Sequence, residues 1–403
     1  MGAVLYDDGV AREFQPFALT RPAGELRAGG EIIRRRWTRV LGTTADGFVG
    51  AAHLARFEEF DAPRAATGTL AAGTWVVNAR CAPALDALVA ADAESVRVGG
   101  RLAAIRLRAP LAAAALASGA ATLEDLERLD GASAGGASSV IDGWWIDRVW
   151  DLIRHINPML ASDAVALAPA HKEVPAHLTV MGDHEVHVDL AAQVEPFVVI
   201  DATAGPVLVR RGATVQAFTR LVGPCIIGED ATVGGGRVGS CSIGERVKVS
   251  GEINSTIMIG HCNKAHDGFV GHSIIGRWAN LGADTVTSNL KNSYGAVSLW
   301  TPHGVVETGL QFLGSLIGDH AKTGIGTRLT TGCVIGAGAN IFGSTMPPKT
   351  VAPFAWGEAP TWETFALEKF LQVSERVMAR RGVPLPEAMR ECLRAAHAAR
   401  WTP

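Results

Sequence analysis

The chain has 403 residues, of which 48% are hydrophobic and 19% are charged, as is ordinary for a soluble globular protein with two or three domains. The net charge of −3 leaves no global basic surface, so we expect neither nucleic acid nor an anionic membrane as the main partner. The six cysteines lie far apart without a C-x-x-C pair, which indicates reduced thiols and a cytoplasmic location.

The N-terminus predicts no export or membrane anchoring. Asp7 and Asp8 stand where a signal peptide would carry basic residues. The most apolar stretch, Leu111 to Ala117, is far shorter than the ~18 residues that a membrane-spanning helix needs.

The first zone, residues 1–175, has the mixed pattern of an α/β domain. We predict an extended start at Ala3 to Tyr6, a helix from Gly29 to Trp37, a strand at Thr74 to Val77 and several alanine-rich helices. Apolar residues at helical spacing then predict a helix from Trp145 to Leu160 that leads into the next zone.

The second zone, residues 176–357, carries an apolar or small residue at every sixth position. The positions are Val209, Val215, Leu221, Ile227 and Val233, and later Ile317, Thr323, Leu329, Ile335 and Ile341. A period of six fits neither an amphipathic helix nor a strand meander, but it is typical of short strands that wind into a parallel β-helix. Glycine often follows the inward residue, as in Ile227-Gly228 and Ile335-Gly336, where a corner leaves no room for a Cβ atom.

Three features interrupt or follow the repeat. The register slips near Gly234 to Gly236 and again between Cys262 and His272. Thr285 to Gly314 predicts a projecting hairpin or loop that turns at Pro302-His303-Gly304. In the third zone, residues 358–403, two helical patterns split by Gly382-Val383-Pro384 predict a helical cap for the end of the stack.

Polar residues in the second interruption carry the most specific pattern. Cys262 to His272, Ile275 to Thr285 and Ser288 to Asn292 together resemble the acetyltransferase domain of the bifunctional family that makes UDP-N-acetylglucosamine. Phe17 to Pro22 and Glu25 to Gly29 extend this resemblance to the N-terminal zone, and the closest likeness is to the alternate form described as a sugar nucleotidyltransferase. The resemblance implies a left-handed parallel β-helix that forms a homotrimer, with acetyl-CoA between coils and the amino sugar at a subunit interface.

The resemblance also implies residue roles. His266 matches the catalytic base, Ala283 supplies an oxyanion-binding N-H, and Asn280 and Asn289 match residues that hold the sugar and the base. An imidazole suits proton transfer near neutral pH. Phe269 stands where the family has a tyrosine beside the sugar. By residue type, Lys248 is a candidate for either phosphate, Lys264, Lys291 and Arg237 are candidates for the sugar phosphate, and Lys322, Arg328 and Lys349 are candidates for the CoA phosphates; spacing alone does not allocate them.

Other interpretations of these residues remain open. His261, Cys262, His266 and His272 are candidate ligands of a metal ion, although their spacing fits no zinc pattern. The two asparagines are equally consistent with an internal ladder that satisfies the coil corners. The lysines are equally consistent with a solvated face.

The N-terminal zone lacks the glycine-rich loop of ordinary sugar-phosphate nucleotidyltransferases and has no lysine before Lys172. Arg21 and Arg27 are the candidate nucleotide-binding cations. Asn78-Ala79-Arg80-Cys81 stands where a Mg²⁺-binding aspartate is expected, which leaves Asp7, Asp8, Asp142 and Asp163 as candidate ligands. An active Mg²⁺-dependent domain and a degenerate domain that supports assembly are both compatible with this pattern.

The favoured function is acetyl transfer from acetyl-CoA to an amino sugar phosphate such as glucosamine-1-phosphate, coupled to uridylyl transfer from UTP that yields UDP-N-acetylglucosamine. A first alternative is a nucleotidyltransferase whose β-helix serves oligomerisation or regulation. A second is a non-enzymatic solenoid scaffold.

Overall fold

A computed structural model describes residues 2–129, 136–169 and 174–403. The chain forms two compact units. The first comprises Met1–Phe14, Ala18–Asp151 and Leu385–Ala399, and the second comprises Gln15–Phe17, Leu152–Pro384 and Arg400–Pro403. Within the described residues, no helix is both long and apolar enough to cross a membrane. All six cysteines are buried and free.

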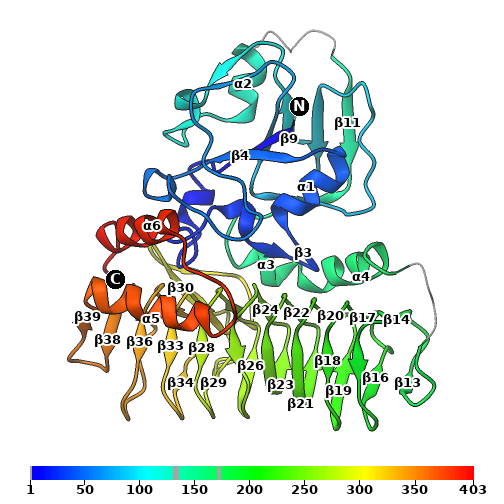
Figure 1. Ribbon diagram of the computed structural model, residues 1–403, viewed down its shortest axis with the longest axis vertical. Helices are drawn as coiled ribbons and strands as arrows, with labels where there is room; N and C mark the ends of the chain where they lie inside the picture. The colour runs from blue at the N-terminus through cyan, green and yellow to red at the C-terminus, as the bar shows by residue number, and fades with distance from the viewer. Residues whose placement is uncertain (1, 130–135, 170–173) are drawn as a thin grey trace. The chain divides into compact units, whose positions relative to one another are not determined.

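The first unit is built on a mixed six-stranded sheet with the order β11-β8-β9-β6-β1-β4 (Figure 1). Its strands are β1 (Ala3–Tyr6), β4 (Ala45–Val49), β6 (Trp75–Asn78), β8 (Ser95–Val98), β9 (Arg101–Arg106) and β11 (Ser138–Ile141). β1 runs parallel to both β4 and β6, whereas β9 is antiparallel to β6 and β8. The predicted strands at the start of the chain and at Thr74 to Val77 are therefore confirmed as β1 and β6.

Short elements surround this sheet. Small antiparallel pairs join β2 (Arg27–Ala28) to β3 (Glu31–Ile32), β5 (Thr69–Leu70) to β10 (Leu111–Ala112), and β7 (Cys81–Pro83) to β12 (Gly143–Trp145). The helices are α1 (Ile33–Leu41), α2 (Leu123–Leu129), α6 (Glu387–Ala398) and the 3-10 helices η1 (Ala11–Glu13), η2 (Ala23–Glu25), η3 (Ala52–Leu54) and η4 (Ala113–Leu116). α6 packs on η3, and Arg56 of this unit pairs with Glu391 of α6 at 2.7 Å. Several alanine-rich helices are predicted for this zone, but the alanine-rich stretch at Ala113–Leu116 forms only η4, a single 3-10 turn.

Two predicted helices have different bounds in the structure. α1 starts at Ile33 rather than Gly29, because the backbone of Arg27–Ala28 pairs with Glu31–Ile32 and so cannot join a helix. The predicted helix from Trp145 is wrong in its first half, because Trp145 ends strand β12. The Asp151 carboxylate accepts the N-H groups of Asp147 (3.1 Å) and Arg148 (2.8 Å), so helix α3 (Asp151–Arg154) begins only there, and α4 (Ile156–Ala166) follows.

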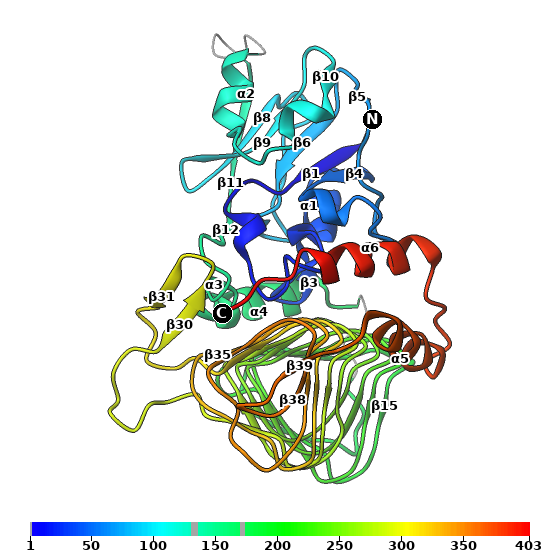
Figure 2. The ribbon, with the colours of Figure 1, turned by 90° about the vertical axis from the view of Figure 1, so that its left-hand side faces the viewer.

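The second unit is a parallel β-solenoid, which Figure 2 shows nearly end-on as a stack of coils. One long sheet contains nine parallel strands: β14 (Val186–Val188), β17 (Val207–Val209), β20 (Cys225–Ile227), β22 (Ser242–Ile243), β24 (Ile257–Met258), β27 (Ile274–Ile275), β32 (Ser315–Ile317), β35 (Cys333–Ile335) and β37 (Thr350–Val351). Each strand pairs with the strand one coil further along, so successive coils lie in register. α4 packs against β17 and β20.

The second long sheet of the solenoid has fourteen strands: β13 (Thr179–Met181), β15 (Gln193–Val194), β16 (Val199–Asp201), β18 (Thr214–Val215), β19 (Thr219–Val222), β21 (Thr232–Gly239), β23 (Lys248–Asn254), β25 (Asn263–Lys264), β26 (Phe269–Gly271), β28 (Asn280–Leu281), β33 (Lys322–Thr323), β36 (Asn340–Ile341), β38 (Ala355–Gly357) and β39 (Glu363–Thr364). β29 (Val286–Thr287) pairs separately with β34 (Arg328–Leu329). Only the last strand, β39, is antiparallel to its neighbour in this sheet.

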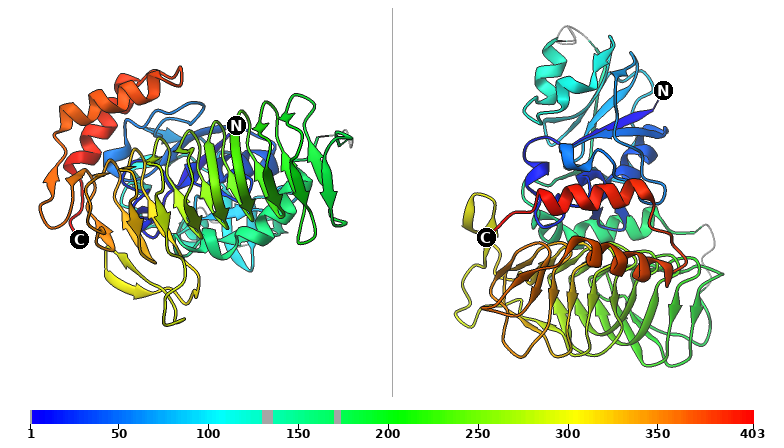
Figure 3. Two further views of the ribbon diagram at one scale, coloured as in Figure 1. Left: turned by 90° about the horizontal axis from the view of Figure 1, so that it is seen from below. Right: turned by 60° about the vertical axis from the view of Figure 1, so that its left-hand side comes forward.

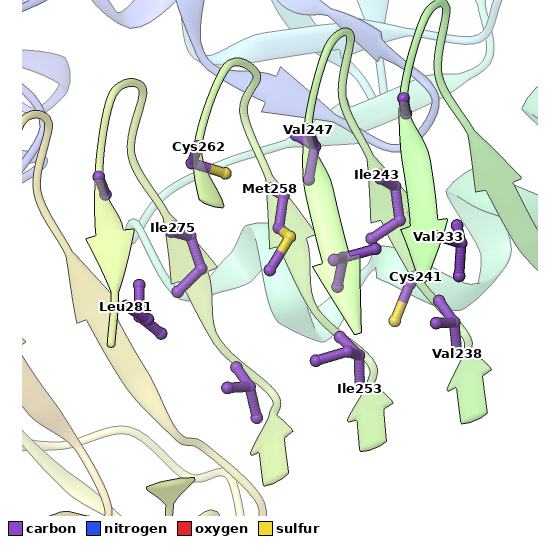
Figure 4. Close-up of a cluster of buried hydrophobic side chains, with 14 of the residues drawn as sticks. Val233, Val238, Cys241, Ile243, Val247, Ile253, Met258, Cys262, Ile275 and Leu281 are labelled. Carbon is purple, nitrogen blue, oxygen red and sulfur yellow. The ribbon is translucent and has the colours of Figure 1, made fainter. Parts of the chain in front are cut away.

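The predicted hexad residues line the interior of the stack. All ten are buried. Figure 4 shows Val233 together with other core residues of the following coils, such as Ile243 and Ile275. The glycine corners are equally tight: a Cβ atom on Gly336 would lie 2.2 Å from the backbone N of Pro353 in the next coil, and one on Gly228 would lie 2.6 Å from the carbonyl oxygen of Ile243. The prediction of a parallel β-helix is therefore confirmed in its period and in its corners.

The predicted interruptions also appear. The pairing of β21 with β23 shifts register between Val233 and Gly236. β30 (Ser298–Thr301) and β31 (Gly304–Glu307) form an antiparallel hairpin that leaves the solenoid, as Figures 1 and 2 show. The hairpin turns at Pro302 and His303, as predicted.

The C-terminal helices do not form one cap. α5 (Leu367–Ala379) runs along the side of the stack (Figure 3): the Phe370 ring lies 4.9 Å from the Phe354 ring, and Arg381, just beyond the helix, donates to the carbonyl oxygen of Arg246 at 3.2 Å. α6 belongs to the first unit. The third zone that the sequence predicts is thus divided between the two units.

Candidate functional site

A row of polar side chains follows the outer face of the solenoid. Register pairs Thr232 with Lys248, Lys248 with Asn263, Asn263 with Asn280, and Asn280 with Lys322. Because neighbouring strands lie about 4.8 Å apart, these side chains stack directly above one another. The second residue of each short strand points inward instead.

Four members of this row, Lys248, Asn263, Asn280 and Lys322, form the floor of a cavity of about 450 Å³. Two further walls come from a coil corner and from the C-terminal end of α5. The lining residues are Lys248, His261, Asn263, Ala265, His266, Trp278, Ala279, Asn280, Lys322, Val377, Arg380 and Arg381. We refer to this cavity as the cationic pocket.

His266 projects from the turn between β25 and β26 and is exposed at the edge of the cationic pocket. The ammonium of Lys264 stabilises this turn from inside the solenoid: it donates to the carbonyl oxygens of His266 and of Asp267, the latter at 2.7 Å. Lys264 occupies an inward, core position and is fully buried. Burial lowers its pKa, which the charges of Asp267 and Asp284 partly oppose. The structure therefore gives Lys264 a positioning role and does not bring it into the pocket as a substrate ligand.

Asn280 lies in the floor of the pocket beside Asn263. The side-chain amide of Asn263 donates to the side-chain oxygen of Asn280 at 2.8 Å, so an asparagine ladder does exist, and both members also face the cavity. Lys322 continues the row, and its ammonium donates to the carbonyl oxygen of His320 at 3.0 Å. Burial lowers the pKa of Lys322 to about 8, so it remains mostly protonated at pH 7.

The pocket has a strongly positive lining. Lys248, Lys322, Arg380 and Arg381 contribute four cations, and none of the described lining residues is an aspartate or a glutamate. Guanidinium and ammonium groups without a competing carboxylate are typical of sites for phosphate groups. Sequence reasoning missed Arg380 and Arg381, because a basic pair at a helix C-terminus is ordinary and nothing local shows which surface the helix covers.

The corner wall is rigid. The rings of His261 and Trp278 lie 4.7 Å apart, and Arg277 contacts both the Nδ1 atom of His261 at 3.1 Å and the carboxylate of Glu245 at 2.6 Å. Trp278 adopts a left-handed backbone at this corner, with φ 61°. The two ring planes are tilted by 43°, and both residues are buried at this corner of the pocket.

The proposed metal cluster is not assembled. Cys262 is buried in the solenoid core, whereas His266 is exposed at the turn. Among residues 2–129, 136–169 and 174–403, no group of three or more His, Cys, Asp or Glu side chains is placed to hold a metal ion. The winding of the coil separates residues that are near each other in sequence.

Two other predicted residues gather on the far side of the His266 turn. The amide of Asn289 donates to the Nδ1 atom of His272 at 2.9 Å, and the His272 ring stacks on Phe312 at 5.3 Å. A Cβ atom on Gly271 would lie 2.5 Å from Phe269 and 2.7 Å from Asn289, so both side chains converge over this glycine. Burial lowers the pKa of His272 to about 4, so the imidazole is neutral at pH 7. Asn289 and Phe269 do not line the cationic pocket.

The remaining predicted residues of the solenoid lie apart. Ala283 is half-buried near the His266 turn, and its carbonyl accepts the N-H of Gly326 at 2.8 Å. Lys291 donates to the carbonyl oxygen of Ala296 within its own loop. Three exposed residues, Arg237, Arg328 and Lys349, do not line the pocket either. Of the predicted phosphate-binding residues, Lys248 and Lys322 do.

Arg21 and Arg27 are internal to the first unit. Arg21 is 1% exposed and pairs with Glu59 at 3.0 Å, and Arg27 is 2% exposed and donates to the carbonyl oxygen of Gly30 at 2.7 Å. Their prediction as nucleotide-binding cations is therefore not supported, since both guanidinium groups are withdrawn from solvent to stabilise the fold.

Comparison with known proteins agrees with the two-part architecture. Residues 3–172 match the family model of sugar nucleotidyl transferases. The chain is 33% identical over 102 residues to the bifunctional protein GlmU of Methanococcus vannielii, covering 25% of this chain and 24% of the relative. It is 30% identical over 97 residues to a bifunctional sugar-1-phosphate nucleotidylyltransferase/acetyltransferase of Sulfurisphaera tokodaii, covering 24% of each. The GlmU protein of Methanocaldococcus jannaschii is 34% identical over 94 residues, which cover 22% of this chain and 23% of that relative.

The matched region spans about a quarter of the length of these relatives. Their names describe enzymes that combine a nucleotidylyltransferase with an acetyltransferase. Residues 3–172 therefore form a domain like that of sugar nucleotidyl transferases, and the chain is similar over part of its length to bifunctional proteins of the GlmU type.

Proposed function

We propose that the chain transfers an acetyl group from acetyl-CoA to the amino group of an amino sugar phosphate, with glucosamine-1-phosphate as the acceptor. The observation that carries this proposal is the cationic pocket beside the exposed imidazole of His266. The names of the relatives support the pairing of acetyl transfer with a sugar nucleotide product.

His266 acts as the general base in this proposal. The amine nitrogen of the sugar attacks the carbonyl carbon of the thioester, and His266 accepts the proton that the amine loses. The tetrahedral intermediate collapses, the carbon-sulfur bond breaks, and the CoA thiolate leaves and is protonated. The buried ammonium of Lys264 holds the turn that presents the imidazole, so the base keeps its position during attack.

The cations of the pocket bind phosphate groups. Lys322 and Arg381 come from two different parts of the lining: Lys322 belongs to the solenoid floor, and Arg381 follows the end of α5. Asn280 lines the same pocket, where its side-chain amide can hydrogen-bond a sugar hydroxyl. The N-H of Ala283 serves as the oxyanion donor, and Phe269 and Asn289 contact the sugar from the other side of the His266 turn.

We further propose a homotrimer, in which a neighbouring copy covers the far side of that turn. Stacked solenoid prisms pack well around a three-fold axis. The exposed rings of Phe197 and Phe218 stack on each other at 5.7 Å and give the solenoid an apolar surface suited to a subunit contact. Light scattering should then report about three times the mass of one chain.

The experiment that tests the proposal is thiol release from acetyl-CoA in the presence of glucosamine-1-phosphate. We expect turnover by the wild type, and a loss of about 100-fold or more in His266→Ala with the oligomer and CoA binding retained. His184→Ala is the matched control, because His184 is also an exposed solenoid histidine but lies outside the pocket. Equal activity of His266→Ala and the wild type would refute the role of this base.

A separate set of variants tests whether the cations of the pocket bind phosphate groups. Arg381→Met and Lys322→Met should raise the KM for acetyl-CoA or for the sugar phosphate, whereas Lys369→Met on the exposed side of α5 should not. The substrate whose KM rises identifies which phosphate each cation contacts.

The family match of residues 3–172 names a second candidate activity, uridylyl transfer from UTP to the acetylated product, which would give UDP-N-acetylglucosamine. The guanidinium of Arg80 on the Asp8 carboxylate argues against a Mg²⁺-dependent form of that reaction in the first unit. Pyrophosphate release that depends on UTP, without thiol release, would favour a nucleotidyltransferase whose solenoid serves only assembly. If the protein shows neither thiol release nor pyrophosphate release, the non-enzymatic scaffold is favoured.

A further inference from the structure

The ends of β1 and β6 form the edge where a nucleotidyl transferase of this type is expected to hold its divalent cation. β1 and β6 are parallel, and Tyr6 at the end of one pairs with Asn78 at the end of the other. Asp7 and Asp8 follow β1, and Arg80 follows β6. In open α/β sheets, ligands bind at such carboxyl ends of parallel strands.

At this edge the guanidinium group of Arg80 binds the carboxylate of Asp8. Asp8 accepts from the Nε atom of Arg80 at 2.8 Å and from its Nη2 atom at 2.7 Å, and the Asn78 side-chain amide also donates to Asp8 at 2.9 Å. The side chains of Arg80 and Asp8 are only 8% and 14% exposed. Burial alone would raise the pKa of Asp8, but the hydrogen bonds and charge of Arg80 outweigh it and keep the pKa below its ordinary value.

The other side of Arg80 is bound as well. Its Nη1 atom donates to Asp147 at 2.7 Å, and Arg101 donates to the same carboxylate at 2.9 Å. Both guanidinium groups lie over the ring of Trp145, with centres 5.5 Å (Arg80) and 3.8 Å (Arg101) from the ring. Asp8, Arg80, Asp147 and Arg101 thus alternate in charge along one connected network.

The other candidate carboxylates do not offer an alternative site. Asp7 is 2% exposed and accepts the N-H of Ala23 at 3.1 Å, so it faces the interior. Asp163 is fully buried on α4 of the second unit. Asp142 is exposed, and no group of three or more His, Cys, Asp or Glu side chains in the described part of the chain is placed to hold a metal ion. Mg²⁺ needs open carboxylate oxygens and room for its waters, and a guanidinium bound to the same carboxylate repels it. The residues present therefore do not fit a divalent cation at this edge.

We propose that Arg80 takes the place of the divalent cation in this unit, so that the domain does not perform metal-assisted nucleotidyl transfer. The fixed guanidinium neutralises Asp8 and Asp147 and ties the ends of β1 and β6 to β12. The hydrogen bonds of the Arg80 guanidinium are made to residues of the first unit, so its positive charge stabilises the fold of that unit.

The test uses the full chain and Mn²⁺ as a spectroscopic probe for Mg²⁺. Electron paramagnetic resonance measures free Mn²⁺ during titration, first alone and then with UTP. We expect wild type and Asp8→Asn to bind Mn²⁺ equally, and Mg²⁺ to cause no UTP-dependent pyrophosphate release. Arg80→Gln should bind Mn²⁺ at least tenfold more tightly than wild type, and the double variant with Asp8→Asn should lose that gain.

The proposal would be overturned by one Mn²⁺ per wild-type chain that Asp8→Asn abolishes while the exposed control Asp92→Asn retains it. Mg²⁺-dependent pyrophosphate release that is lost in Asp8→Asn would also overturn it. If Arg80→Gln fails to fold, the comparison of wild type with Asp8→Asn decides alone. Thiol release at His266 is a separate readout, so failure of either proposal is recognised independently.

Discussion

Asp7 offers a quantitative test of the first unit. Its side chain is 2% exposed at the end of β1, where one oxygen accepts the N-H of Ala23 at 3.1 Å. Burial raises the pKa of Asp7 from 3.8 to about 7, and this effect exceeds the opposing hydrogen bond from Ala23. The folded unit therefore binds a proton at Asp7 across a pH range in which the unfolded chain has released it.

The direction of the pH effect follows from this difference. Between about pH 4 and pH 7 the folded state binds more protons than the unfolded state, so the free energy of unfolding decreases as the pH rises. The pKa increase from 3.8 to about 7 corresponds to about 4 kcal/mol when each pKa unit counts for about 1.4 kcal/mol. Asp7→Asn keeps an oxygen acceptor for Ala23 but removes the charge.

We expect Asp7→Asn to become progressively more stable than the wild type as the pH rises, with a gain of about 4 kcal/mol at pH 8 relative to pH 4. Urea denaturation followed by circular dichroism at several pH values measures this difference. Asp92→Asn, at an exposed aspartate of the same unit, is the control and should follow the wild-type profile. A constant difference between Asp7→Asn and wild type at all pH values would refute the assignment of a raised pKa to a buried Asp7.

Two further predictions concern the solenoid. Gly336→Ala should lower the free energy of unfolding by about 3 kcal/mol, because its Cβ atom would lie 2.2 Å from the backbone of Pro353. The control Gly295→Ala, with open space around the glycine, should be nearly neutral. Chemical denaturation measures the free energy of unfolding of both variants. Lys264→Met should lower kcat by about tenfold with little change in the KM for acetyl-CoA, because the turn that presents His266 loses its internal hydrogen-bond donor. Steady-state thiol release measures both constants. An unchanged kcat would contradict the positioning role of Lys264.

Most of the solenoid could be predicted from local sequence. The six-residue period places Val209, Leu221 and Ile335 in the core whatever the rest of the chain does, because each short coil must bury one face. The projecting hairpin followed in the same way from a turn at Pro302-His303-Gly304 between two extended segments. The limit of local reasoning appears at Trp145, where strand pairing with β7 prevailed over helical spacing.

The candidate site was only partly predictable. His266 and Asn280 stand in a polar break of the repeat, and the structure brings both to one cavity. Lys264 was misjudged because residue type reports a charge but not which side of a two-residue strand carries it.

The sequence alone determined that this protein contains a β-solenoid and where its polar interruption lies, because a repeat of six residues is a short-range pattern. Only the tertiary structure decided the composition of the cationic pocket, because α5 folds back along the coils and delivers Arg380 and Arg381 to residues more than a hundred positions earlier. It also decided that Arg80 pairs with Asp8 rather than leaving a carboxylate free, since that contact joins two strands 72 residues apart in the chain.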